Sequence, residues 1–577
     1  MNGGERVAAH LAGAEVRHLF TLCGGHISPI LVGAKARGIR VVDVRDEGNA
    51  VFAADATARL SGTVGVAAVT AGPGVTNSLT PLRNALMARS PVLLLGGATA
   101  TVLRGRGSLQ DIDQIAAVRS HVKWAARART LAELDAHVER ALLEARSGVP
   151  GPVFVECPVD LLYSPELVRE LYGVTTPLEA SASLGQRAER WYLERHLRKT
   201  LRDDGSSGAT GKPQAVVRRA PSPTDIQRAV AMLSAAERPV MLVGSQAMEA
   251  PGESALLAEA VRSTGLPTYL AGMARGLLGM AAPTQLRHQR KQALREADLV
   301  ILAGTPVDFR LDYGRHIGAR TRIIAANGDA AELKRNRRPT LGVYADADLF
   351  VRALAAASLP GSWAPWLATL RARDAVRDAE IESLAAAPVD PVNPIALCRA
   401  VDDLLEEQSI VVADGGDFVA TASYVLHPRA PLGWLDPGVF GTLGVGAGFA
   451  LGAKLHRPQS DVWLLYGDGA AGFSLMEFDS FVRHGVPVIA VIGNDASWAQ
   501  IAREQVPLFS DDVGTKLARS SYERVAEAFG AKGFVVHSPD EVAPTLAAAR
   551  AAARAGSPVL VNVMIGATDF RKGSISL

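Results

Sequence analysis

Hydrophobic positions along the chain occur in short continuous runs rather than in an alternating pattern. These runs are rich in β-branched residues and are separated by longer Ala- and Leu-rich stretches. Continuous apolar runs are typical of strands that are buried on both faces, as in parallel sheets covered by helices. Several runs end in Gly, Asp or Asn, at the position where open α/β sheets bind ligands. The pattern therefore predicts an α/β fold. The predicted strands include VRHLFTL, VGVAAVT, SPVLLLGG, GPVFVECP, RPVMLVG, DLVILAG, TRIIAAN, SIVVADG, DVWLLYGDG, PVIAVIG and SPVLVNVMIG.

Changes in composition divide the chain into three predicted domains and one linker. A chain of 577 residues is long enough for about three domains. The predicted domains are residues 1–165, 223–359 and 389–577, with a linker over 166–222. The linker contains RDDGSSGATGKPQAVVRRAPS, which is typical of a flexible connection. It also contains QRAERWYLERHLRKTLR, whose spacing predicts a helix that either packs on a neighbour or is a solvated basic helix.

Composition and charge indicate a soluble globular protein with large apolar cores. Hydrophobic residues make up 48% of the chain, and 61 basic against 59 acidic residues leave a formal charge of only +2. This balance predicts no nucleic-acid partner and no membrane partner. The three cysteines, Cys23, Cys157 and Cys398, form no CxxC pair, which favours a reduced compartment. No apolar run reaches the ~18–20 residues of a membrane span, and no signal-like pattern opens the chain. We expect a cytoplasmic protein.

The motif GDG at Gly467–Gly469 follows the predicted strand VWLLY, and Asn494 follows a second predicted strand. The carboxylate of Asp468 and the amide of Asn494 are 494 − 468 = 26 residues apart. At the ends of two parallel strands they can converge on one hard cation such as Mg²⁺. The backbone N–H groups of Gly469 and Ala470 can approach a diphosphate. The alternative is two ordinary strand-end turns, which the combination with Asn494 disfavours.

A second group of motifs lies in the first domain. Glu47 ends the predicted strand IRVVDVRDE and precedes an Ala-rich helix. A glutamate at that position is usually a helix-start or surface residue. The glycine-dense turn TAGPGVTN at Thr70–Asn77 favours a functional role, because a bulky ring could lie close to its backbone.

Together, GDG with its trailing Asn, the Glu ahead of AADATAR, and AGPGVTN resemble the acetohydroxyacid-synthase-like superfamily of thiamine-diphosphate enzymes. The resemblance covers the whole chain as a pyrimidine-binding, a middle and a diphosphate-binding domain. The segment GPVFVECPVDL at Gly151–Leu161 resembles the end of the family's first domain. The resemblance implies thiamine diphosphate and Mg²⁺ as cofactors. It also implies a homodimer or homotetramer, because the family's cofactor lies between two chains.

The resemblance also implies roles for individual residues. Glu47 is expected to hydrogen-bond the cofactor's N1′, which favours the imino tautomer whose 4′-nitrogen removes the thiazolium C2 proton. Asp468, Asn494 and the carbonyl of Ala496 match the family's metal ligands. Leu443 is expected to wedge the two cofactor rings, and Asp417 is an unusual acidic neighbour for a diphosphate. Further expected cofactor contacts are Pro73, Asn77, Gly416, Gly441, Leu443, Gly467, Gly469, Ala470 and Trp498.

Three families compete for the reaction: acetolactate synthases, oxalyl-CoA decarboxylases and 2-hydroxyacyl-CoA lyases. The segment LAGTPVDFRLDYG at Leu302–Gly314 resembles the apolar-aromatic stretch of the CoA-using relatives. Basic clusters at Arg287–Lys291 and Lys334–Arg338 either meet the phosphates of CoA or are solvated surface charge. Gln110 stands where the oxalyl-CoA enzymes have Glu, which argues against the decarboxylase.

Further motifs, among them GGHISPIL, GMARGLLG and GNDASWAQIAREQVP, resemble the acetolactate-synthase-like type of 2-hydroxyacyl-CoA lyase. Such an enzyme splits a 2-hydroxyacyl-CoA into formyl-CoA and an aldehyde, or joins them in reverse. His26 at a Gly-Gly turn is the candidate for handling the substrate proton, with turn stabilisation as the alternative. Two rival functions stay open: a carboligase acting on 2-oxo acids, and a non-catalytic binding protein. Retention of Glu47, Asp468 and Asn494 disfavours the second.

Overall fold

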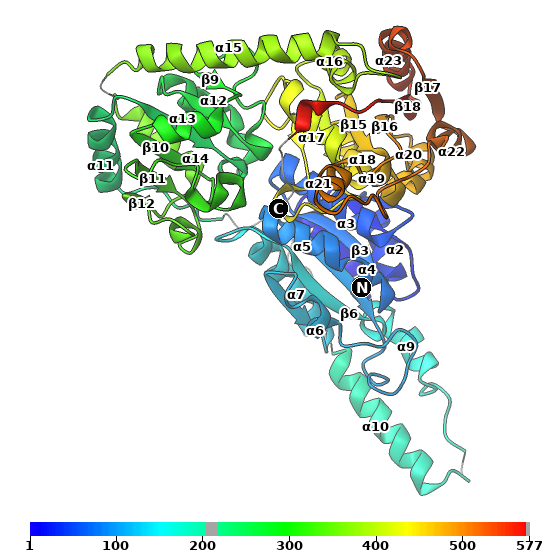
Figure 1. The fold of residues 1–577 in the computed structure, drawn as a ribbon. Helices are drawn as coiled ribbons and strands as arrows, with labels where there is room; N and C mark the ends of the chain where they lie inside the picture. Colours follow the sequence, from blue (N-terminus) through cyan, green and yellow to red (C-terminus); the bar gives the residue numbers. More distant parts are fainter. Residues whose placement is uncertain (180, 203–215, 360, 573–577) are drawn as a thin grey trace. The chain divides into compact units, whose positions relative to one another are not determined.

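The computed structural model describes residues 1–572 except 180, 203–215 and 360 (Figure 1). It divides into two compact units. The first comprises Met1–Arg59 and Thr63–Val217, and the second comprises Leu60–Gly62 and Arg218–Leu577. Within these described residues there are three six-stranded sheets, one in the first unit and two in the second. All strand pairs in the three sheets are parallel, which confirms the predicted three-domain α/β fold.

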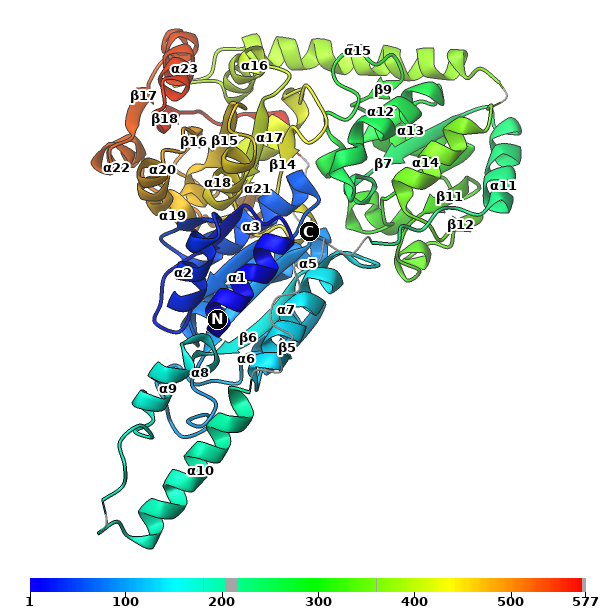
Figure 2. The same ribbon diagram turned by 180° about the vertical axis from the view of Figure 1, so that it is seen from behind.

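The sheet of the first unit has the order β2-β1-β3-β4-β6-β5. Its central strands β3, β4 and β6 are buried along their whole length, as their continuous apolar sequences predict. Helices α1 and α2 cover one face, and α3 and α5 cover the other (Figures 1 and 2). The strands are β1 (His18–Thr21), β2 (Arg40–Asp43), β3 (Gly65–Val69), β4 (Val92–Ala98), β5 (Trp124–Arg127) and β6 (Val153–Pro158). The helices are α1 (Gly3–Gly13), α2 (Ser28–Ala36), α3 (Glu47–Ser61), α4 (Pro73–Asn77), α5 (Leu79–Ala88), α6 (Gln114–Val118), α7 (Leu131–Arg146), α8 (Val159–Leu162), α9 (Pro165–Leu171) and α10 (Leu184–Thr200).

The first sheet of the second unit has the order β12-β11-β10-β7-β8-β9. Its core gathers around the fully buried strands β7 and β10. The strands are β7 (Pro239–Val243), β8 (Thr268–Leu270), β9 (Gln285–Leu286), β10 (Leu299–Ala303), β11 (Arg322–Ala326) and β12 (Leu341–Val343). The α-helices are α11 (Pro223–Ser234), α12 (Ser254–Ser263), α13 (Arg290–Glu296), α14 (Ala347–Ala356) and α15 (Ala364–Ala386). Short 3₁₀ helices are η1 (Ser245–Met248), η2 (Pro251–Glu253), η3 (Gly272–Ala274), η4 (Phe309–Gly314) and η5 (Glu332–Lys334).

The second sheet of this unit has the order β14-β13-β15-β16-β18-β17. Strands β15 and β16 are adjacent and parallel, so their carboxyl ends lie at the same edge of the sheet. The strands are β13 (Ile410–Asp414), β14 (Trp434–Leu435), β15 (Val462–Gly467), β16 (Ile489–Asn494), β17 (Lys532–Val536) and β18 (Val559–Met564). The helices are α16 (Pro394–Leu404), α17 (Asp417–Val425), η6 (Gly438–Phe440), α18 (Gly446–His456), α19 (Asp468–Ser474), η7 (Leu475–Glu477), α20 (Phe478–His484), α21 (Ala499–Phe509), α22 (Tyr522–Ala528), α23 (Pro539–Arg554) and η8 (Asp569–Arg571).

The predicted linker 166–222 contains the long helix α10, which confirms the helical spacing of its basic segment. Most of the Gly- and Ser-rich stretch, residues 203–215, lies outside the described residues. The boundaries at 165, 222, 359 and 389 stay predictions. Among the helices that the structure describes, we find none with the length and apolar character of a membrane span.

Candidate active site

In the first unit, Glu47 opens helix α3 just beyond strand β2 and is buried. Its Oε2 accepts a hydrogen bond of 3.0 Å from Nδ2 of Asn77, the last residue of α4. The backbone of Gly74 also lies close, because a Cβ added there would be 3.5 Å from Oε1 of Glu47. The structure thus brings the predicted Glu47 and Asn77 together at the glycine-dense turn.

Gln110 lies against the same turn. A Cβ added at Gly72 would be 2.8 Å from the backbone oxygen of Gln110, so only glycine fits this approach. Gln110 itself has a φ of 62°, a left-handed conformation that is uncommon for a side chain of this size. Gln114, which the sequence did not single out, fixes the turn: its Oε1 accepts from Gly72 N at 2.9 Å and its Nε2 donates to Gly97 O at 3.0 Å.

His26 borders the first residue of the turn. Its Nδ1 is 3.2 Å from Oγ1 of Thr70, and burial lowers the pKa of His26. The lowered pKa favours a neutral imidazole at neutral pH, which can accept a proton. Glu47, Gln110 and His26 therefore all border Thr70–Asn77.

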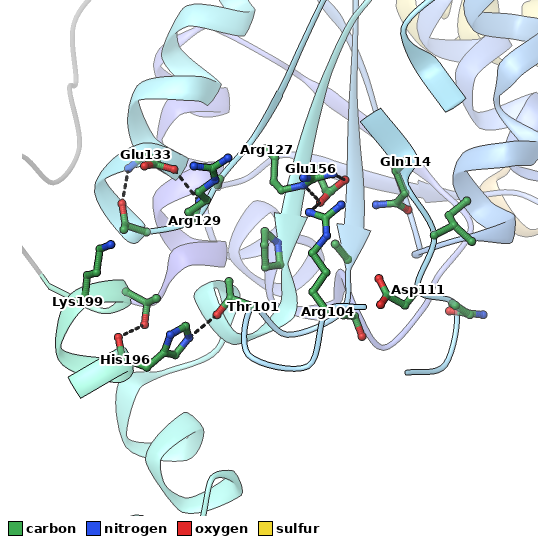
Figure 3. A pocket seen from close by; sticks show the side chains of 18 residues that line it. Thr101, Arg104, Asp111, Gln114, Arg127, Arg129, Glu133, Glu156, His196 and Lys199 are labelled. Atoms are coloured by element: carbon green, nitrogen blue, oxygen red, sulfur yellow. Dashed lines mark hydrogen bonds and ion pairs between the residues drawn. The ribbon is translucent and has the colours of Figure 1, made fainter. Parts of the chain in front are cut away.

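A charged cavity of about 470 Å³ has Gln110 and Gln114 in its wall, and Gln114 is labelled in Figure 3. Arg104 and Arg127 both form ion pairs with the buried carboxylate of Glu156 in its wall. The sequence did not predict this cavity, because its wall joins residues from separate strands, loops and α10.

In the second unit, Asp468 begins α19 directly after β15, and Asn494 ends β16. The parallel pairing of Gly467 with Gly493 places both side chains at one sheet edge. Both are buried, at 2% and 0% exposure. Oδ2 of Asp468 and Oδ1 of Asn494 have no hydrogen-bond partner within the described chain. Two buried orphan oxygens of these types fit a hard cation.

The orientation of Asn494 is set by Asn562, a polar residue inside the buried strand β18. Nδ2 of Asn494 donates to Oδ1 of Asn562 at 3.1 Å. Nδ2 of Asn562 in turn donates to Ser520 O at 2.9 Å and to Oε2 of Glu523 at 2.8 Å. This chain of bonds leaves Oδ1 of Asn494 free. The only sequence signal for this role of Asn562 is a single polar residue within the otherwise apolar run VLVNVM.

Within the described residues, Asp468 and Asp495 form no ion pair with a basic side chain. Burial raises the pKa of Asp468, and burial together with the charge of Asp468 raises the pKa of Asp495 to about 7. Such a site attracts a positive ion. Ala496 turns the chain with a φ of 56°, and its carbonyl accepts from Leu517 N at 2.7 Å. A second lone pair of that carbonyl stays available to a metal.

The GDG turn packs tightly against its neighbours. A Cβ added at Gly469 would be 2.4 Å from the ring of Trp498, so the ring lies on the backbone of the turn. Ala470 follows, buried in the first turn of α19. The unusual Asp417 forms ion pairs with Arg503 and Arg571, which neutralise its charge.

The neighbouring glycines approach each other through their backbones. A Cβ added at Gly415 would be 2.7 Å from Gly467 N, which places the predicted Gly416 and Gly467 segments side by side.

The segment around Gly441 and Leu443, both of which are expected to contact the cofactor, is held in place by Asp414, which was not among the predicted site residues. Asp414, at the end of β13, is fully buried and accepts from Gly444 N at 3.1 Å and Gly446 N at 2.8 Å. Burial raises the pKa of Asp414 to about 7. Gly441 has a φ of 66°, a left-handed conformation that glycine adopts without a steric cost because it has no Cβ.

Family models match each of the three sheets. The thiamine pyrophosphate enzyme N-terminal TPP binding domain matches residues 1–117, the central domain matches 226–354 and the C-terminal TPP binding domain matches 414–563. The chain belongs to the thiamine pyrophosphate enzyme family.

Within that family, the chain is similar over its whole length to 2-hydroxyacyl-CoA lyase 2. It is 48% identical to the protein of that name from Danio rerio, covering 100% of this chain and 93% of the relative. It is 47% identical to that of Homo sapiens, with 100% and 92% covered. A probable acetolactate synthase of Mycobacterium bovis (strain ATCC BAA-935 / AF2122/97) is 34% identical, with 98% and 96% covered.

Proposed function

We propose that the protein is a 2-hydroxyacyl-CoA lyase that splits its substrate into formyl-CoA and an aldehyde, and joins the two in reverse. Full-length identity of 48% to a 2-hydroxyacyl-CoA lyase 2, against 34% to an acetolactate synthase, supports this reaction over the carboligase alternative. The structural observation that carries the proposal is a basic pocket in the second unit.

This pocket has a volume of about 900 Å³ and is lined by Arg275, Arg287 and Arg290. Across the described chain, none of the three forms an ion pair with a carboxylate. Their guanidinium groups donate instead to the backbone carbonyls of Ser423, Tyr424, Leu426 and Arg310. A ligand with several phosphates would pair directly with these guanidinium groups.

The arginines also repel each other. Burial, together with the charge of Arg275, lowers the pKa of Arg287 to about 10. The pKa of Arg290 is lowered by the same two causes. Phe309 lines the pocket, is exposed, and offers aromatic surface to an adenine ring. Phosphates and adenine together are the recognition features of a CoA ester.

The two basic clusters differ in their positions. Arg287, Arg290 and Lys291 of the first cluster line the pocket. Arg337 of the second cluster instead donates to the backbone carbonyls of Gly314 and Ile317, and so holds the end of η4 in place.

The donor set of the second unit fits the cofactor and its metal. Asp468, Asn494 and the carbonyl of Ala496 would hold Mg²⁺, and the N–H groups of Gly469 and Ala470 would face the diphosphate. Thiamine diphosphate, when bound, supplies a nucleophilic carbon and an electron sink.

The chain's own residues would then handle protons and orientation. Asn77 donates to Glu47 and so holds the carboxylate in one orientation, from which it can bond a ring nitrogen of the cofactor. His26, kept neutral by burial, can take up and return the proton of a substrate hydroxyl.

The test is a product assay. Purified protein with thiamine diphosphate, Mg²⁺ and a 2-hydroxyacyl-CoA should release formyl-CoA and the aldehyde one carbon shorter. Formation of acetolactate from pyruvate, at a rate that CoA does not affect, would refute the lyase and leave the carboligase.

A pair of variants tests the basic pocket. Arg287→Glu with Arg290→Glu should raise KM for the CoA ester at least ~100-fold, because each of the two lost charge-assisted contacts contributes about 1.5–3 kcal/mol. The kcat should change little, since phosphate contacts bind ground and transition states alike. The matched control, Arg320→Glu with Arg338→Glu, reverses two exposed charges outside the pocket and should leave KM unchanged. If KM for the CoA ester is the same in the pocket variant and in the control variant, CoA binds outside this pocket.

A further inference from the structure

Helix α10 packs on the first unit through its carboxyl-terminal end, and Arg190 in its middle donates to backbone carbonyls of the segment before the helix. Nε2 of His196 is 2.8 Å from Oγ1 of Thr101, and Leu197 and Thr200 are buried beside this contact (Figure 3). From this carboxyl-terminal end the helix extends away from the sheet of its unit (Figures 1 and 2). The amino-terminal half of α10 is therefore the part of the helix that lies farthest from this sheet.

One side of α10 carries apolar residues followed by basic ones. At about 100° per residue, Leu184, Trp191, Arg195 and Arg198 fall within about 40° of a single line along the helix, and Arg202 follows two residues after the helix ends at Thr200. Leu184 and Trp191 are 86% and 56% exposed. No acidic residue falls within this stripe. We call these five residues, with the adjacent Lys199, the α10 stripe.

The basic part of the α10 stripe borders a shallow hollow of about 800 Å³ together with Trp191. Arg195 lies over the Trp191 ring, 5.4 Å from its centroid. Throughout the residues that the structure describes, Arg195, Arg198, Lys199 and Arg202 have no carboxylate partner. Their charge is available to an external anion.

We propose that the α10 stripe binds the surface of an anionic lipid bilayer. The chemistry is that of a membrane interface: an exposed Leu and Trp enter the acyl boundary, and arginines and lysine meet the phosphates. A nucleic-acid site would use the cations and the aromatic ring but would gain nothing from Leu184.

Vesicle flotation of the full-length protein tests the proposal. Wild type should float with phosphatidylcholine vesicles containing about 30% phosphatidylserine, and much less with phosphatidylcholine alone or in 0.5 M NaCl. Each basic residue near the surface contributes about fivefold to binding. Arg195→Gln, Arg198→Gln and Arg202→Gln together should therefore weaken partitioning roughly 100-fold. Leu184→Ala with Trp191→Ala should also release the protein.

The control removes the same charge elsewhere in the unit: Arg17→Gln, Lys35→Gln and Arg37→Gln, all exposed, should leave flotation unchanged. The lyase assay and the thermal midpoint should be equal in all variants, which separates this proposal from the proposed reaction. Equal flotation of wild type and the stripe variants, or no flotation of wild type, would overturn it. A change of molar mass in the stripe variants by light scattering would also overturn it, because the face would then join copies of the chain.

Discussion

Replacing Asp468 by Asn should remove the stabilisation that thiamine diphosphate and Mg²⁺ together give the protein, while the fold stays intact. Asparagine keeps the shape of the side chain and can still accept the bond from Gly469 N. It replaces Oδ2, a buried oxygen with no partner in the described chain, by an amide nitrogen that cannot ligate a cation. The metal then loses its charged protein ligand, and the diphosphate loses its counter-charge.

The size of the effect follows from binding linkage. At a cofactor concentration 100 times Kd, binding stabilises the folded state by about 2.7 kcal/mol. A domain of this size gains roughly 2–4 °C in Tm per kcal/mol, so wild type should shift by about 5–10 °C. If the substitution weakens binding 100-fold, the stabilisation falls to about 0.4 kcal/mol and the shift to roughly 1 °C.

Differential scanning fluorimetry of three samples measures this: protein alone, with thiamine diphosphate, and with thiamine diphosphate plus Mg²⁺. The Tm of the Asp468→Asn protein alone should equal or exceed that of wild type, because a buried carboxylate without a cation is costly. Asp403→Asn, an exposed change of the same charge in the same unit, should shift like wild type. A full shift in Asp468→Asn would refute the metal site, and a low Tm without ligand would point to a folding defect.

Three further outcomes are expected. Glu47→Gln should lower kcat at least ~100-fold and keep the thermal shift with cofactor, because glutamine keeps the shape but not the charge; near-normal turnover would remove Glu47 from the mechanism. Burial raises the pKa of Asp414 to about 7. The folded chain therefore binds a proton that the unfolded chain releases between about pH 4 and 7, and stability from this group falls as pH rises across that window. Asp414→Asn should flatten the difference between urea unfolding at pH 5 and pH 7.5, and an unchanged difference would contradict the assignment. CoA and ADP should inhibit competitively against a 2-hydroxyacyl-CoA, whereas non-competitive inhibition would place them outside the substrate site.

The central strands of all three sheets were predictable because burial on both faces writes a continuous apolar run into the sequence. β10 and β15 are examples, and both lie where the sequence predicted them. Of the edge strands, β2 was predicted within IRVVDVRDE, whereas β5, β9, β12, β14 and β17 were not. β5 is half-buried along its length, and β17 mixes exposed and buried positions, so neither carries that signal. β9 and β14 have two residues each, too few for any pattern.

The site shows the same division between local and long-range information. Asp468 and Asn494 follow strands that the sequence reveals, so their convergence could be predicted. Gln114 and Asn562 act on residues 42 and 68 positions away, and no local pattern encodes such a contact. The α10 stripe could not be predicted from the net charge, because a formal charge of +2 is a sum over the whole chain. That sum does not show where basic residues cluster on the surface.

The three unpaired arginines of the basic pocket have a practical consequence for anyone who handles this protein. Inorganic phosphate and sulfate are small anions that guanidinium groups bind well. In such buffers they would relieve the repulsion among Arg275, Arg287 and Arg290 and so protect the purified protein during storage. The same ions would compete with a CoA ester during an assay and inflate its apparent KM. Storage in sulfate and kinetics in a zwitterionic buffer are therefore the matched pair of conditions for this enzyme.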